Sequence, residues 1–238
     1  ANQHPTGMLD NVTNVVSKNW EYAIPDYSLW WVMAIWNHYL YTGEEEWVHQ
    51  YYPHSLKVIQ AFLSYIDDYG LLNDMPYWPL IDWAHLDRRG EYAPLNALFY
   101  GCLEKVKKMA ELKNDSYTIE MAEEVRKGIR ANFTQRLFDS EKGCFVDANV
   151  EGELSDMVSE HSNASAILWG LCDKEIIDEV VANFYEKENI TYTEAQPYYT
   201  TVVLQALDRI GRFDLALEII RDRWGKRMVD RGASSAFE

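Results

Sequence analysis

The sequence predicts an all-α fold, a toroid of helical hairpins whose loops carry small β-hairpins. Three observations lead to this prediction. Apolar residues recur at three- and four-residue steps along most of the 238 residues, which is the spacing of amphipathic helices. Long irregular stretches separate successive helical pairs. The pairs share no common period near about 34 or 45 residues, which argues against tetratricopeptide or HEAT repeats.

The first helical pair covers about residues 26–69. Its opening segment, 26–41, is apolar nearly all round, which in a soluble protein indicates a helix enclosed by other helices. We therefore expect this helix on the inner wall of the toroid. Gly43 follows it, and glycine readily adopts the left-handed conformation that ends helices. The acidic residues after Gly43 suit the start of a second helix, because the helix dipole favours negative charge there.

Three further helical pairs follow, at about residues 92–134, 158–186 and 198–224, and the apolar pattern becomes weaker from Ala122 onward. The stretches 70–91 and 135–157 contain prolines, glycines and short alternating runs, which predict small β-hairpins at the ends of helices. Irregular connections of this length in a compact protein are usually functional. We therefore expect the functional residues in these loops.

The whole chain, 1–238, is short enough for a single domain, and we expect 1–23 to be an irregular lead-in. No apolar run reaches the roughly 18–20 residues that a membrane span needs. The first seven residues are polar rather than a signal peptide, and the chain starts without Met. Several Asn-x-Ser/Thr sequences slightly favour a secreted or periplasmic protein over a cytoplasmic one.

Composition and charge exclude several classes of partner. Hydrophobic residues make up 47% of the chain and charged residues 25%, which is typical of a folded globular protein. The formal net charge of −16 would repel nucleic acid and anionic membranes. Cys102, Cys144 and Cys172 are widely spaced and show no metal-ligand spacing. We expect no disulfide framework, no metal and no cofactor.

Three loop segments concentrate the residue types that sugar chemistry uses. In the first, Asp82 lies among the indoles of Trp78 and Trp83, so a carboxylate that binds hydroxyls is close to apolar faces. The second precedes the last helical pair and contains Tyr198. The third is the end of the chain, where small residues lead to Glu238. Taken alone, each segment also has an interpretation as a capping acid or a core aromatic.

Together, these segments resemble the catalytic domain of family 78 α-L-rhamnosidases from about Ile24 to the last residue. The shared motifs, in order, are Ile81-Asp82-Trp83, Gly90-Glu91, Pro94-Leu95-Asn96-Ala97-Leu98, Ser159-Glu160-His161-Ser162-Asn163-Ala164, Trp224-Gly225, Met228, Arg231-Gly232-Ala233 and Glu238. Related six-hairpin glycosidases share parts of this pattern. The resemblance implies an (α/α)6 barrel, here with eight of twelve helices, that hydrolyses terminal α-L-rhamnose with inversion.

The resemblance also implies roles for individual residues. Glu238 matches the general base of the family, whereas the general acid is expected upstream of residue 1, so we expect this chain to be inactive alone. The remaining matched positions face the sugar-binding cavity, and they are Asp26, Asp82, Trp83, His161 and Tyr198. His161 is equally consistent with a buried core histidine.

Two other functions stay open. Another six-hairpin glycosidase, such as an unsaturated uronyl hydrolase or a trehalase-like enzyme, is the nearest enzymatic alternative. A uronic acid would require basic residues in the pocket, for which Arg88 and Arg89 are candidates. The other alternative is a helical carbohydrate-binding or scaffold domain without catalysis. For the rhamnosidase, the expected partners are a rhamnose-containing oligosaccharide or glycoside and the remaining domains of the parent chain.

Overall fold

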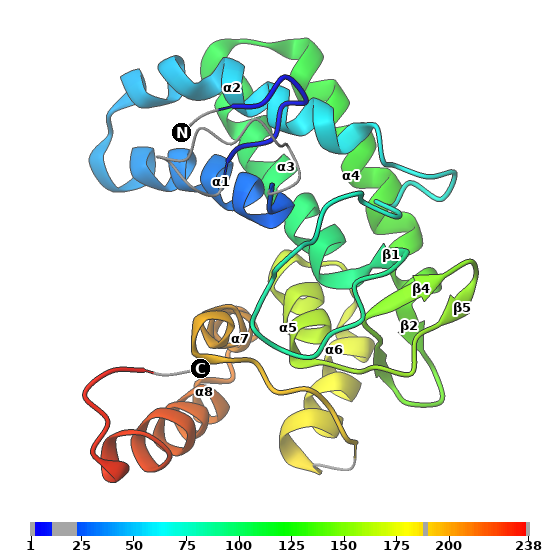
Figure 1. Ribbon diagram of the computed structural model, residues 1–238, viewed down its shortest axis with the longest axis vertical. Helices are drawn as coiled ribbons and strands as arrows, with labels where there is room; N and C mark the ends of the chain where they lie inside the picture. The colour runs from blue at the N-terminus through cyan, green and yellow to red at the C-terminus, as the bar shows by residue number, and fades with distance from the viewer. Residues whose placement is uncertain (1–2, 11–22, 188–189, 237–238) are drawn as a thin grey trace.

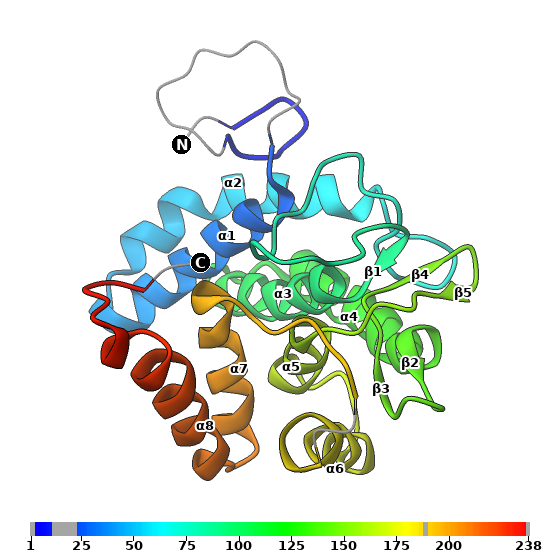
Figure 2. The same cartoon turned by 60° about the horizontal axis from the view of Figure 1, so that its bottom comes forward.

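The computed structural model of the protein describes residues 3–10, 23–187 and 190–236. Four helical hairpins follow one another along an arc (Figures 1 and 2). The helices, in chain order, are α1 Pro25–Thr42, α2 Glu45–Leu63, α3 Ala93–Lys113, α4 Ser116–Leu137, α5 Glu160–Trp169, α6 Lys174–Val181, α7 Pro197–Arg209 and α8 Phe213–Ile219. Short π-helical segments, η2 Ala182–Glu186 and η3 Ile220–Lys226, extend α6 and α8, and a 3-10 turn, η4 Val229–Arg231, follows.

The predicted all-α class and the incomplete toroid of hairpins are confirmed. The first helix of each hairpin packs on the first helix of the next, in the order α1, α3, α5 and α7. The second helices, α2, α4, α6 and α8, lie outside them (Figure 2). A close approach between α3 and α5 explains Gly101, where a Cβ atom would lie 2.4 Å from the Trp169 indole.

The ends of the helices follow from local sequence. Pro25 opens α1, where the missing N–H of proline costs nothing. Gly43 ends α1 at a φ of 73°, as predicted, and donates its N–H to the carbonyl of Tyr39. Asp115 caps α4 by accepting a hydrogen bond from the Thr118 N–H. Gly43 and Asp115 lie in the tight turns between paired helices, whereas Pro25 fixes the start of the first hairpin.

The expected enclosure of the first helix holds for one of its faces. Leu29 and Val32 are buried against the neighbouring helices, whereas Leu40 and Tyr41 at its end are 62% and 92% exposed in the described structure. No described helix has both the length and the apolar character that crossing a membrane requires.

The strands are short and lie in the loops. They are β1 Glu91–Tyr92, β2 Phe138–Asp139, β3 Cys144–Phe145, β4 Ala148–Val150 and β5 Glu153–Leu154. Strands β2 and β3 pair with each other, and β4 pairs with β5, so the prediction of hairpins in residues 135–157 is confirmed. The prediction of a hairpin within 70–91 is wrong, because β1 at its end pairs with β4 instead, Glu91 opposite Asn149.

Candidate active site

The candidate site lies at the end of the arc where α1, α5 and α7 begin. Residues 74–90, between the first two hairpins, form an irregular loop over this end (Figures 1 and 2). Side chains from the first turns of α1 and α5, and the backbone before α7, all bind this loop. The helical arc therefore brings together segments that are far apart in the sequence.

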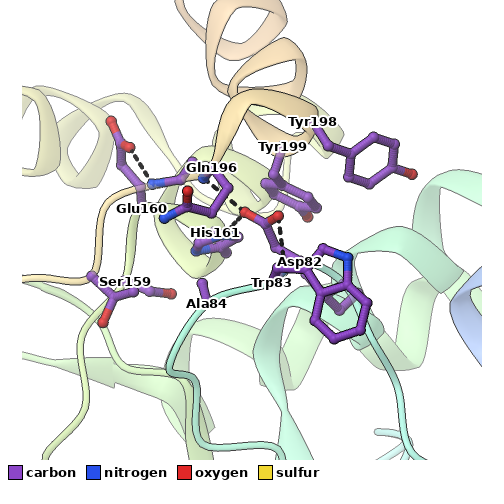
Figure 3. Close-up of polar contacts among 12 residues, drawn as sticks. Asp82, Trp83, Ala84, Ser159, Glu160, His161, Gln196, Tyr198 and Tyr199 are labelled. Atoms are coloured by element: carbon purple, nitrogen blue, oxygen red, sulfur yellow. Dashed lines mark hydrogen bonds and ion pairs between the residues drawn. The ribbon is translucent and has the colours of Figure 1, made fainter. Parts of the chain in front are cut away.

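The carboxylate of Asp82 joins three of these segments (Figure 3). Its Oδ2 atom lies 2.6 Å from Nε2 of His161 and accepts the backbone N–H of Gln196 at 2.8 Å. Its Oδ1 atom accepts the N–H of Trp83 at 2.9 Å. Asp82 and His161 are 1% and 0% exposed. The pair is thus a buried junction between the loop, α5 and the start of α7.

Aromatic side chains around this junction are open to solvent. Trp78, Trp83 and Tyr198 are 49%, 64% and 46% exposed. The two indoles lie 5.9 Å apart between ring centroids, and Figure 3 shows Trp83 and Tyr198 on the same side of the Asp82 carboxylate. Partial burial and nearby carboxylates raise the pKa of Tyr198, so its hydroxyl stays protonated and can donate a hydrogen bond. Together these rings form a wall that suits a sugar ring.

Two charged residues hold the backbone of the loop. Asp26, fully buried in the first turn of α1, accepts the N–H groups of Leu80 and Ile81 at 2.8 and 3.1 Å. The guanidinium of Arg88 donates to five backbone carbonyls, those of Pro79, Leu80, Asp82, Ala84 and Leu86. Arg89, in contrast, forms an ion pair with Asp87 at 2.7 Å. These contacts occupy both arginines.

A second buried carboxylate, Glu160, precedes His161 on α5. Arg223 of η3 binds it with two hydrogen bonds of 2.8 and 3.0 Å, and Tyr185 of η2 donates its hydroxyl at 2.9 Å. The backbone N–H of Ala195 donates to the same carboxylate at 2.9 Å. The next amide, that of Gln196, binds Asp82. Consecutive amides of one loop are therefore shared between two buried carboxylates.

Asp147 is a third buried carboxylate, and it connects the loop to the start of α5. Its Oδ1 accepts the hydroxyls of Ser159 and Ser162 at 2.5 and 2.7 Å, and its Oδ2 accepts the N–H of Asp87 at 3.3 Å. Burial raises the pKa of Asp147, and the two serine hydroxyls act against that rise. Within the ranges that the structure describes, no group of three His, Cys, Asp or Glu side chains is arranged to hold a metal ion.

Most of the predicted site residues come together. The junction consists of Asp82 and His161, and the rings of Trp78, Trp83 and Tyr198 lie around it. Asp26 binds the backbone of the same loop. Contact between a sugar and the buried members of this set stays a prediction. Glu238 lies outside the described residues, so its predicted meeting with Trp83 also stays a prediction.

Sequence reasoning missed four contributors to the site, namely Arg88 as a loop clamp, Glu160, Arg223 and the Gln196 amide. The motif around His161 already contained Glu160, and a charged residue beside a helix start was a usable signal. The backbone amide of Gln196 carries no sequence signal, because every residue except proline has one.

Comparison with known proteins gives consistent results. The alpha-L-rhamnosidase of Formosa agariphila is 24% identical over 214 residues, which cover 84% of this chain and 21% of that protein. A family 78 rhamnosidase of Bacillus sp. GL1 matches 91% of this chain and 23% of its own, at 25% identity and a TM-score of 0.80. A rhamnosidase from Klebsiella oxytoca with rhamnose bound matches 98% of this chain and 45% of its own, at 20% identity and a TM-score of 0.82.

This chain thus spans between 21% and 45% of the length of these three relatives. The bacterial alpha-L-rhamnosidase 6 hairpin glycosidase domain, as a family, matches residues 1–238. The TM-scores of 0.80 and 0.82 show that this chain shares its overall fold with the matched parts of both solved structures. Because the family match covers the whole chain, this chain belongs to the bacterial α-L-rhamnosidase six-hairpin glycosidase family.

Proposed function

We propose that the protein containing this chain hydrolyses terminal α-L-rhamnose from glycosides, with inversion at the anomeric carbon. The observation that carries the proposal is the Asp82 junction, which holds exposed aromatic rings around one spot at the end of a rhamnosidase-family arc. Rhamnose has apolar C–H faces and a methyl group that match the indoles, and hydroxyls that match polar groups near Asp82. The proposed partners are a rhamnose-containing glycoside and the other domains of the parent chain.

Catalysis requires two carboxyl groups besides this binding wall. In an inverting glycosidase, one protonates the leaving oxygen and the other activates water, and the two lie roughly 6.5–9.5 Å apart. We propose Glu238 as the base. For the acid we propose a carboxyl group outside this chain, on the basis of the family resemblance. The exposed Trp83 and Tyr198 then bind the ring between the two groups.

The geometry disfavours a uronic acid substrate. A uronate carboxylate would need a free cation in the pocket, preferably a guanidinium with two donors available. The donors of Arg88 are occupied by five loop carbonyls, and Arg89 forms an ion pair with Asp87.

The noncatalytic alternative would use the same aromatic wall to bind a sugar, but it predicts no turnover. For the compartment, we propose export to the periplasm or the outside of the cell.

The test is hydrolysis of an aryl α-L-rhamnoside by the full-length protein and its Glu238→Gln variant. The substitution keeps the shape of the side chain but removes the charge that activates water. We expect kcat to fall about 10²–10⁴-fold or more, while rhamnose still binds. Glu153→Gln, at an exposed carboxylate in β5, is the matched control and should leave kcat unchanged. Full turnover in Glu238→Gln would exclude Glu238 as the base.

A further inference from the structure

The backbone directly before Asp82 has an unusual conformation. Ile81 has a φ of +54°, and the N–H of Asp82 donates to the carbonyl of Leu80 at 2.5 Å. A hydrogen bond across three residues with a positive φ at the centre defines a γ-turn of the rare, strained kind. A positive φ is most unfavourable for a β-branched residue such as isoleucine. Strain of this kind persists only where surrounding contacts enforce it.

Two charged residues supply those contacts, the fully buried Asp26 and the partly buried Arg88. Asp26 accepts the N–H groups of Leu80 and Ile81, the two peptides that enter the turn. Arg88 donates to the carbonyls of Leu80 and Asp82, at 3.1 and 3.0 Å, and to three further carbonyls on either side. The Ile81 side chain is fully buried and anchors the centre. The amides and carbonyls of the turn are thus held at the same time.

The turn sets the direction of the next two residues. Asp82 must point inward to meet His161 and the Gln196 amide, whereas Trp83 must point outward beside Tyr198. With Ile81 in an extended conformation, the chain would leave the turn in another direction and break these contacts. Arg88 also lies 5.3 Å from the centre of the Trp78 ring, so the same guanidinium supports the second indole.

We propose that Asp26 and Arg88 are positioning residues of the sugar site, which hold the γ-turn at Ile81 and thereby orient Asp82, Trp83 and Trp78. The inference rests on the proposed function and gives Asp26 a role in shaping the site instead of contact with the sugar. Burial raises the pKa of Asp26 to about 6, although two backbone hydrogen bonds and Arg88 act in the other direction. A carboxylate held at such a cost is consistent with a specific structural task.

The experiment substitutes Arg88→Lys in the full-length protein. Lysine keeps the charge, but a single ammonium cannot donate to five carbonyls spread over residues 79–86. The first measurement is the exciton signal of the Trp78 and Trp83 pair in far-ultraviolet circular dichroism, defined as the signal that Trp78→Phe removes. The second measurement is kcat and KM for an aryl rhamnoside. We expect loss of the exciton signal and about a tenfold rise in KM with little change in kcat, since binding geometry is lost.

The matched control is Arg136→Lys. Arg136 has a largely buried side chain, binds Glu91 through two nitrogens, donates to Asn149 and lies over the Tyr69 ring, so its partners lie outside residues 79–86 that Arg88 holds. This variant should keep the exciton signal and KM even if its Tm falls. Asp26→Asn is the second variant; it leaves one acceptor oxygen for two amides and should show the same changes. If Arg88→Lys does not fold, the exciton signal and KM of Asp26→Asn test the proposal.

The outcomes separate the two proposals. An Arg88→Lys protein with unchanged exciton signal and KM overturns the positioning role, whatever its Tm. A wild-type protein that neither cleaves nor binds the rhamnoside refutes the proposed function. In that case the exciton signal alone decides whether Arg88 and Asp26 orient the indoles.

Discussion

Asp26 shows what it costs to bury a carboxylate, even one with hydrogen-bond partners. It is 0% exposed, and its two carboxylate oxygens accept two loop amides. Burial raises its pKa from 3.8 to about 6, which means that the folded protein holds the proton more tightly than the unfolded chain. Proton binding at Asp26 therefore favours the folded state. This stabilisation is fully present below the unfolded value of 3.8 and is lost as the pH rises through about 6.

We predict that Asp26→Asn removes this part of the pH dependence. For the wild-type protein, ionisation of Asp26 should lower the free energy of unfolding by about 2 kcal/mol between about pH 4 and pH 6. The difference between variant and wild type, measured by urea denaturation across that range, isolates Asp26 from other buried carboxyl groups such as Asp147. At low pH the variant should be less stable than the wild type, because the NH2 group of Asn faces an amide donor, and this difference should shrink as the pH rises through about 6.

Asp87 is the control for the sign of this effect. The hydrogen bond from Arg89 lowers the pKa of Asp87 to about 2, so its stabilisation is present above the unfolded value of 3.8 and is lost as the pH falls through about 2. Asp87→Asn should therefore change the acid side of the curve and leave the slope between about pH 4 and pH 6 unchanged. An Asp26→Asn curve parallel to that of the wild type would contradict the assignment.

At the scale of the elements, two π-helical segments converge on one carboxylate. Tyr185 in η2 and Arg223 in η3 both bind Glu160 at the start of α5. Wider π-helical turns shift the side chains that follow, and they occur often at functional sites. Because Glu160 precedes His161, this contact links the last two hairpins to the Asp82 junction. The π-helical turns therefore have a geometric task in this fold.

We predict that Arg223→Met destabilises the protein by about 3–5 kcal/mol, because it leaves the buried Glu160 carboxylate without its cation. The double variant Glu160→Gln with Arg223→Met should be less destabilised than the sum of the single changes. Urea denaturation of the full-length protein measures all three.

Arg212 forms exposed ion pairs with Asp214 and Glu186, and its pair with Glu186 is the comparison. Both side chains are partly solvated, at 29% and 47% exposure, and an exposed ion pair contributes little. Arg212→Met should cost under about 1 kcal/mol. Equal losses for Arg212→Met and Arg223→Met would mean that burial of Glu160 does not set the energy of its ion pair.

At the scale of the whole molecule, four hairpins form an arc that carries only part of the proposed chemistry. The chain spans 21% to 45% of three rhamnosidase relatives. Groups from α1, from α5 and from the segment before α7 all contact the loop of residues 74–90, whereas the proposed inverting reaction requires two carboxyl groups in addition.

We predict that the 238-residue chain expressed alone hydrolyses no aryl α-L-rhamnoside, while the full-length protein does. Loss of one of the two proton-transferring groups typically costs about 10²–10⁴-fold in rate. Circular dichroism should first establish that the isolated chain is helical, so that absent turnover is not simply a failure to fold. Turnover by the folded chain would place both carboxyl groups within Ala1–Glu238.

Helical periodicity was enough to predict the hairpins and several of their ends. Gly43 ends α1 as expected, because its backbone requirement is local. Asp82, Trp83 and His161 were identified by their resemblance to a family, and their meeting depends on the arc. The partner of β1 was missed, since Glu91 and Asn149 are distant in sequence. Arg88, a candidate for a uronate ligand in the alternative function, binds loop carbonyls instead, because a guanidinium can donate to either kind of acceptor and only the fold shows which ones are nearby.

The Asp82 junction also has a consequence for the order in which the chain folds. Its contacts close loops of 79 residues to His161 and 114 residues to Gln196. Contacts of such separation form late, because chain entropy must be lost before they contribute, whereas each hairpin closes over a short turn. Helices therefore precede the site during synthesis and refolding. In mild denaturant, the loop that holds Trp83 should become disordered while most of the helical circular dichroism signal survives. Activity would therefore disappear before the helices unfold.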